Sequence, residues 1–160
     1  MNTETQKLTR FVALDAALLT LALLIPIASH WLSLPLYKVN PMLAVLLAGM
    51  LIGRDWRNSL VLAVALPLFS CMATGMPAAP KMLCMVAEYA TVVGLFAAVS
   101  RRWKVLPAVL VAVLAGKVVY YLLKAVVVAP AVLIGTDVGV QLLAVLLWGG
   151  LFALLYRKLQ

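Results

Sequence analysis

Ionisable groups suited to catalysis are scarce in this chain of 160 residues, which contains five aspartates and glutamates together and a single histidine. The sequence contains no HExxH motif, no Walker-type phosphate loop, no paired aspartates on facing apolar segments and no Ser–His arrangement. These absences argue against an enzyme and against a metal or cofactor site. If the protein moves a solute uphill, the energy must come from an ion gradient or from a partner.

Cysteine is also rare, and Cys71 and Cys84 both lie within apolar runs without CxxC spacing. We interpret both as small packing residues and not as a redox pair or metal ligands. Charged residues make up 11% of the chain, against about 25% in ordinary soluble domains, while 66% of the residues are hydrophobic. A soluble core of this size could not bury so much apolar surface. We therefore predict an all-α integral membrane protein, because helices satisfy their own backbone hydrogen bonds in lipid.

Six apolar segments are apparent, and no long hydrophilic linker divides them, so we expect one domain over residues 1–160. The predicted spans are 11–29, 39–53, 59–76, 82–100, 105–128 and 136–156. The second span is short beside the roughly 20 residues that a perpendicular helix needs. It either lies half-embedded or includes part of the preceding HWLSLPLYKV, where Pro35 and Pro41 disfavour one continuous helix.

The first apolar run follows Lys7 and Arg10 and has no small-x-small cleavage site after it. We therefore expect a retained span and not a signal peptide. Asp15 lies one turn inside this span, where it can reach the interface or Arg10 in a structural role. His30 and Trp31 are expected in the first outer loop.

The formal net charge is +8, and the basic residues occur in short clusters between the apolar segments. These clusters lie at the termini and in alternate connections, whereas the other connections hold Lys38 and Lys81, with Lys124 at a helix end. The positive-inside rule therefore predicts a six-helix transmembrane bundle with both termini cytoplasmic. The clusters are expected to meet anionic lipid headgroups and not nucleic acid. Alternate connections hold most of the basic residues, namely Lys7, Arg10, Arg54, Arg57, Arg101, Arg102, Lys104, Arg157 and Lys158.

A carboxylate, Glu88, interrupts the apolar run MVAEYATVVG at 85–94, about 9 Å below the outer end of its helix when counted from Met82. A charge in hydrocarbon costs several kcal/mol unless it is paired, protonated or hydrated, so Glu88 marks a partner, a ligand or a water-filled cavity. Helical spacing gathers further polar side chains on shared helix faces in the outer half of the bundle, and the first outer loop adds Asn40. Such a mixture of aromatic and hydrogen-bonding groups is typical of a small-molecule site. These side chains are Asn40, Lys81, Cys84, Lys117, Tyr120, Tyr121, Lys124, Asp137, Gln141 and Trp148.

Simpler roles are open for several of these residues. Glu88 and Lys117 could pair with each other and hold two helices together, whether or not they line a pocket. Tyr120 and Tyr121 could be interfacial aromatics. We expect Lys124 to extend to the outer lipid headgroups.

Small residues form a second pattern, with Ala13 and Ala17 four apart and Gly49 and Gly53 four apart. Small-xxx-small spacing lets helices approach closely in lipid. The pattern indicates either packing within the bundle or docking against a separate membrane protein.

Two stretches resemble one family of membrane proteins, NPMLAVLLAGMLIGRDW at 40–56 and LFSCMATGMPAAPKMLCMVAEYATVVGLFAA at 68–98. Their shared features are a glycine-bearing second span, a TGMP…P outer turn and a glutamate-tyrosine helix ending in VVGL. With the Ala13-xxx-Ala17 spacing and six short helices, residues 10–125 are similar to the substrate-binding subunit (S component) of energy-coupling factor (ECF) transporters.

The resemblance implies a multi-pass subunit of the bacterial cytoplasmic membrane that captures a vitamin or vitamin precursor at the outer side. It implies docking on a transmembrane coupling protein driven by two cytoplasmic ATPases, with Ala13 and Ala17 on the docking face. It places Lys117 at the floor of the ligand pocket. Carried over by position, the ligand-binding residues are Asn40, Lys81, Glu88, Lys117, Tyr120, Tyr121 and Gln141.

The sequence leaves the chemical class of the ligand undecided and is also compatible with two other functions. A carboxylate ligand would favour Lys117 or Lys81, and a pyridine, pyrimidine or amine would favour Glu88, with tyrosines stacking on a ring. A proton-linked small-molecule transporter would use Glu88 as the proton carrier, more naturally as a homodimer. A structural membrane protein of the rod-shape type would use Glu88 as an ion-paired strut.

Overall fold

The computed structural model describes residues 3–31, 40–53, 55–75, 77–127 and 138–158, and within them the regular structure is α-helix. The prediction of an all-α chain is confirmed for this part of the protein. The six described helices are α1 (Thr3–Trp31), α2 (Pro41–Gly53), α3 (Trp56–Thr74), α4 (Ala79–Val99), α5 (Val105–Val127) and α6 (Val138–Lys158).

Five of the described helices, α1 and α3 to α6, are long and apolar enough to cross a membrane. They indicate a multi-pass membrane protein. The exception is α2, whose 13 residues span about 20 Å at 1.5 Å per residue. This length is short of the roughly 30 Å of a bilayer's hydrocarbon core.

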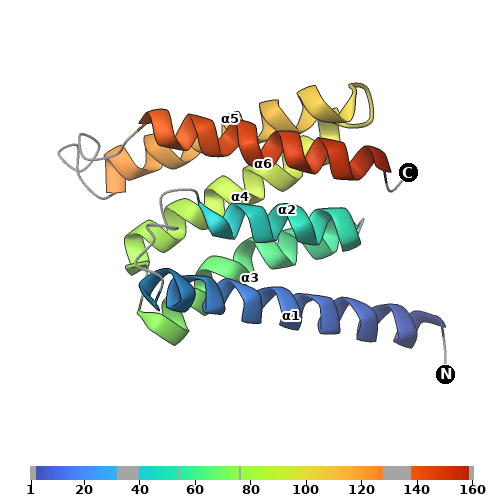
Figure 1. Ribbon diagram of the computed structural model, residues 1–160, viewed down its shortest axis with the longest axis horizontal. Helices are drawn as coiled ribbons and strands as arrows, with labels where there is room; N and C mark the ends of the chain where they lie inside the picture. Colours follow the sequence, from blue (N-terminus) through green and yellow to red (C-terminus); the bar gives the residue numbers. More distant parts are fainter. Residues whose placement is uncertain (1–2, 32–39, 54, 76, 128–137, 159–160) are drawn as a thin grey trace.

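Successive helices run in opposite directions, so both termini lie at one end of the bundle (Figure 1). The turns from α2 to α3 and from α4 to α5 lie at the same end. We call it the basic end, because its described side chains include Arg57, Arg101, Arg102, Lys104, Arg157 and Lys158. At the opposite end α2, α4 and α6 begin.

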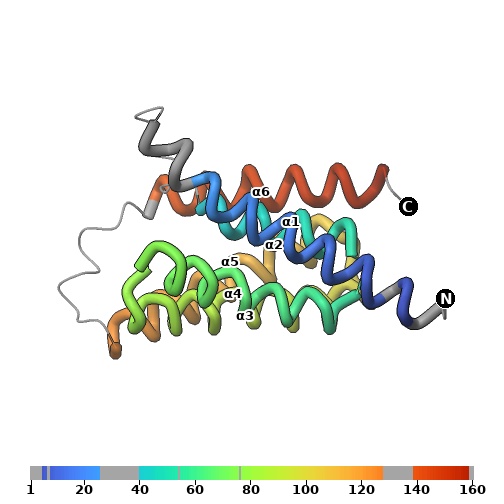
Figure 2. Tube along the Cα trace, turned by 90° about the horizontal axis from the view of Figure 1, so that it is seen from below, coloured from blue at the N-terminus to red at the C-terminus, as the bar shows by residue number. Residues whose placement is uncertain are grey.

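The short helix α2 occupies the middle of the bundle, where it packs against α1, α3, α4 and α6. Figure 1 shows it between α6 and α1, and in Figure 2 the slanted α1 crosses over it. Its residues Leu43 and Leu46 are completely inaccessible to solvent. A helix that is apolar all round is stable in such a buried position, which explains why α2 has no polar face.

The start of α2 is fixed by Asn40 and Pro41. Asn40 has a left-handed backbone with φ of 50°, a conformation that asparagine tolerates better than most residues. Its carbonyl oxygen accepts a hydrogen bond from the N–H of Leu43 at 3.1 Å, while Pro41 begins the helix, where no N–H is needed. The alternative in which the second span includes HWLSLPLYKV is wrong for His30 and Trp31, because α1 continues through both. The same observation corrects their expected place in a loop.

Local signals also set the ends of α3 and α4. Asp55 caps α3 by accepting the backbone N–H of Arg57 at its Oδ1, at 2.9 Å. Gly75 ends the helix in the left-handed conformation, with φ of 69°, as glycine does without steric cost. A proline, Pro80, lies in the first turn of α4.

The two small-residue pairs have different surroundings. A methyl group added at Gly49 would collide with Leu62 and meet Leu18, so Gly49 lets α2 pack closely on α1 and α3. Ala13 and Ala17, in contrast, are exposed on the outer face of α1. Packing within the bundle therefore explains the glycine but leaves the alanines facing lipid or a partner.

Asp15 forms a hydrogen bond between helices, accepting the side-chain amide N–H of Asn58 on α3 at 3.0 Å. The expected structural role of Asp15 is thus seen in a contact with Asn58, and Arg10 is not the partner found. Hydrogen bonds of this kind between spans are worth roughly 0.6 kcal/mol on average. This one anchors α1, which otherwise has few buried side chains, to the rest of the bundle.

Candidate functional site

Glu88 lies in the middle of α4 and faces α5, with 1% of its surface exposed. Because α4 begins at Ala79, Glu88 is about 14 Å from the helix start, deeper than the 9 Å counted from Met82. An ideal Cβ at Gly116 would lie 3.0 Å from the backbone oxygen of Glu88 and 2.6 Å from Cγ2 of Val92. The bare glycine therefore lets the backbone of α5 approach α4 at the level of the carboxylate.

Lys117, the next residue on α5, is the charge partner of Glu88. Its Nζ lies 2.7 Å from Glu88 Oε1, and both side chains are buried, with 11% and 2% of their surfaces exposed. The contact is an ion pair, and beyond it Oε1 has no hydrogen-bond partner among the described residues. The carboxylate is thus neutralised by charge while one of its oxygens keeps unused hydrogen-bonding capacity.

Asn40 connects the start of α2 to this pair. Its side chain hydrogen-bonds Glu88, and its Oδ1 accepts the hydroxyl proton of Tyr89 at 3.0 Å. Tyr89 is completely buried. The sequence analysis placed Asn40 in the site but missed Tyr89. The available signal was a tyrosine in an apolar run, since a buried hydroxyl usually finds a hydrogen-bond partner.

Two tyrosines on α5 border the ion pair. Lys117 Nζ lies 5.6 Å from the centre of the Tyr120 ring, within the range of a cation–π contact. Tyr120 meets Tyr121 edge to face, with ring centres 5.3 Å apart. Tyr120 is buried and Tyr121 is half-buried, so at least the first is more than an interfacial anchor. We call Asn40, Glu88, Tyr89, Lys117 and Tyr120 the buried polar cluster.

Two further lysines lie toward the opposite end of the bundle from the basic end. Lys81 is exposed in the first turn of α4. Lys124 lies about one helical turn beyond Tyr121 on α5 and is buried, with 7% of its surface exposed. It is close enough to Lys81 and Cys84 to interact electrostatically with them. This burial does not fit the expected extension of Lys124 to the lipid headgroups.

The remaining nominated residues are less closely connected to the cluster. Gln141 is half-buried near the start of α6, a helix that packs on α5 and α2. Trp148, two turns further on, is also half-buried. Asp137 and the side chain of His30 lie outside the described residues. Both cysteines are free thiols, Cys84 buried and Cys71 half-buried.

The cluster combines the kinds of side chain that bind small polar molecules in proteins. Glu88 supplies a hydrogen-bond acceptor, Lys117 a charged donor, and Tyr120 an aromatic face beside them. All three come from the most extensive helix contact in the bundle, that of α4 with α5. Comparison of the chain with protein-family models, curated proteins and solved structures finds no match.

Proposed function

We propose that this protein is the solute-binding membrane subunit of an ECF-type uptake transporter in the bacterial cytoplasmic membrane, with a vitamin or vitamin precursor as its solute. The observation that supports this most is the Glu88–Lys117 pair, buried halfway along two apolar helices. A buried ion pair adds little to stability compared with apolar side chains of the same size. Ionisable groups within spans commonly mark the path or site of a solute.

The geometry around the pair favours a ligand with both a donor and an acceptor group. Glu88 Oε1 has hydrogen-bonding capacity to spare, and Lys117 has three donor protons. The pair is neutral overall, so a zwitterion or a hydrogen-bonding heterocycle fits without adding net charge. A ring in the ligand would stack on Tyr120.

The orientation that we propose puts the basic end in the cytoplasm, with both termini, and the Lys81 end outside. The described residues of the basic end include six arginines and lysines on or beside the helix ends, as the positive-inside rule requires of cytoplasmic connections. We propose that the solute reaches the buried polar cluster from that outer side.

The proposed partner is a transmembrane coupling protein powered by two cytoplasmic ATPases. Ala13 and Ala17 are exposed on α1, and a helix of the partner could approach closely over such small side chains. The absence of a nucleotide-binding sequence in this chain is consistent with energy supplied by separate subunits.

A structural role is the second candidate, and the ion pair itself favours it. An Nζ to Oε1 distance of 2.7 Å is what a strut between α4 and α5 would show without any ligand. The proton-linked transporter is distinguished by function: it predicts solute flux driven by a pH gradient in vesicles containing this protein alone, which the ECF-type proposal forbids.

A panel of vitamins and precursors should contain one compound that raises the melting temperature of the purified protein. A ligand at 100 times its Kd stabilises the folded state by about 2.7 kcal/mol. Glu88→Gln should abolish this gain, because it removes the charged acceptor while keeping the shape of the side chain. Lys104→Gln, a change at an exposed lysine at the basic end and outside the nominated site, is the control for altered charge. An unchanged melting temperature across the whole panel would contradict the proposal.

Ala13→Trp or Ala17→Trp should prevent co-purification with the coupling protein and leave ligand-induced stabilisation intact. A tryptophan there fills the space that a partner helix needs. Ala98→Trp, at an exposed position on α4, is the control for a bulky residue on the lipid-facing surface. Co-purification of the Ala13 and Ala17 variants at the wild-type level would show that α1 is not the docking face.

A further inference from the structure

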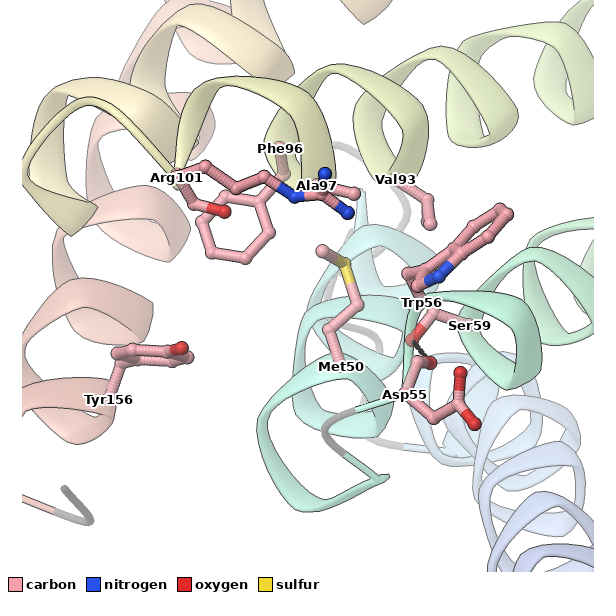
Figure 3. A pocket seen from close by; sticks show the side chains of 10 residues that line it. Met50, Asp55, Trp56, Ser59, Val93, Phe96, Ala97, Arg101 and Tyr156 are labelled. Atoms are coloured by element: carbon pink, nitrogen blue, oxygen red, sulfur yellow. Dashed lines mark hydrogen bonds between the residues drawn. The ribbon is translucent and has the colours of Figure 1, made fainter.

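A cleft of about 200 Å³ opens at the basic end, between the ends of α2, α3, α4 and α6. Met50, Val93 and Phe96 form its apolar part, and Trp56, Arg101 and Tyr156 form its more polar part. Figure 3 shows the guanidinium of Arg101 over the cleft, on the side of Met50 away from Asp55. None of these residues belongs to the buried polar cluster.

The cleft has a gradient of polarity along α4. Val93 and Ala97 line it from one face of α4, and Arg101 lines it from the turn that follows the last helical residue, Val99. Val93 lies about 9 Å along the axis before the end of α4 at Val99. The cleft therefore passes from a cationic mouth at the end of the bundle to an apolar floor two turns inside it.

The positive charge of Arg101 at the mouth of the cleft is not neutralised by Asp55, the acidic residue that also lines the cleft. Arg101 forms no ion pair among the described residues. Asp55 also lines the cleft, but its Oδ1 caps α3, and its carboxylate points away from Arg101 in Figure 3. A second guanidinium, that of Arg57, lies 5.7 Å from the ring centre of Trp56 at the rim.

We propose that this cleft binds the phosphate headgroup of an anionic phospholipid, with Arg101 on the phosphate and the first part of an acyl chain along Met50, Val93 and Phe96. Guanidinium groups bind phosphate oxygens through paired hydrogen bonds. Basic pockets between spanning helices on the cytoplasmic side suit anionic headgroups. Tyrosine and tryptophan prefer the same depth, at the boundary of headgroups and hydrocarbon.

A lipid explains the site better than a soluble anion does, because half of the lining is apolar and continues into the bundle. A free phosphate would use the mouth and leave the floor of Met50 and Phe96 empty. The inference is independent of the proposed transport function, since it concerns the other end of the molecule.

The test compares the full chain in nanodiscs of phosphatidylcholine with the same chain in discs that also contain phosphatidylglycerol. The anionic lipid should raise the melting temperature of the wild type by about 2–4 °C. Arg101→Gln should lose this rise. Arg102→Gln, which removes the same charge from the neighbouring exposed residue outside the cleft, should keep it, and Arg101→Lys should keep part of it.

Each alternative result has a distinct meaning. An equal loss in Arg101→Gln and Arg102→Gln would show diffuse surface attraction and overturn the proposal. An equal rise from inorganic phosphate in phosphatidylcholine discs would assign the mouth to a soluble anion and overturn the lipid assignment. Native mass spectrometry gives a second readout: retention of phosphatidylglycerol by the wild type and Arg102→Gln, but not by Arg101→Gln, supports the site even if the melting temperatures change for another reason.

Discussion

Lys117→Met is expected to destabilise the bundle by about 3–5 kcal/mol, which is the usual cost of removing one partner from a buried ion pair. Glu88 is 1% exposed in the middle of α4, so without Lys117 its charge would have no charged partner among the described residues. Unfolding of the purified protein in a mild detergent, followed by circular dichroism, measures the change. Lys81→Met removes the same charge from an exposed position and should change stability by less than about 0.5 kcal/mol.

The double variant Glu88→Leu with Lys117→Met should recover most of the lost stability. Two apolar side chains of similar volume remove both the charges and the desolvation cost, and such replacements are often neutral or stabilising. A single Lys117→Met variant as stable as the wild type would show that Glu88 does not need its partner. The pair would then have no energetic role in joining α4 to α5.

Gly116→Ala is expected to cost about 1–3 kcal/mol, as overpacking of a tight interface does. The new methyl group would lie 2.6 Å from Val92 Cγ2 and 3.0 Å from the backbone oxygen of Glu88. The valine side chain can move, but the carbonyl of a helix interior cannot move without shifting α4. The separation of α4 and α5 should therefore increase, which also lengthens the Glu88–Lys117 contact.

Gly94→Ala is the matched control, because a Cβ at Gly94 meets no atom within 4 Å. Alanine is the better helix former by up to about 1 kcal/mol, so this variant should be as stable as the wild type or slightly more stable. Comparison of melting temperatures and of ligand-induced shifts in the two variants separates the close approach at residue 116 from a general effect of glycine in a span. Equal behaviour of both variants would contradict the role given to Gly116.

Hydropathy alone predicted most of the helices. The span predicted at 105–128 is the helix Val105–Val127, because a basic cluster precedes it and the apolar run itself is continuous. The start of α1 was placed at residue 11, whereas the helix begins at Thr3. Hydropathy marks the residues that contact lipid, and a helix can continue beyond them through polar residues.

The Glu88–Lys117 contact was one of the alternatives predicted from the sequence, because each residue is a lone charge in the middle of an apolar run. The hydrogen bond between Tyr89 and Asn40 was not predicted from the sequence. That hydrogen bond depends on the left-handed backbone of Asn40 and on the position of α2 within the bundle. A short sequence pattern predicts neither feature. The cleft beside Arg101 likewise depends on how the ends of four helices are placed relative to one another. The sequence of any one helix does not predict that arrangement.

Ligand binding by the Glu88→Leu, Lys117→Met double variant distinguishes a binding site from a strut most directly. The measurement is isothermal titration of the folded double variant with the compound that stabilises the wild type. If these two side chains hold the solute, the variant unfolds at nearly the wild-type temperature and gives no binding heat. Binding at wild-type affinity by the charge-free variant would show that the pair merely joins two helices and that the solute, if there is one, binds elsewhere.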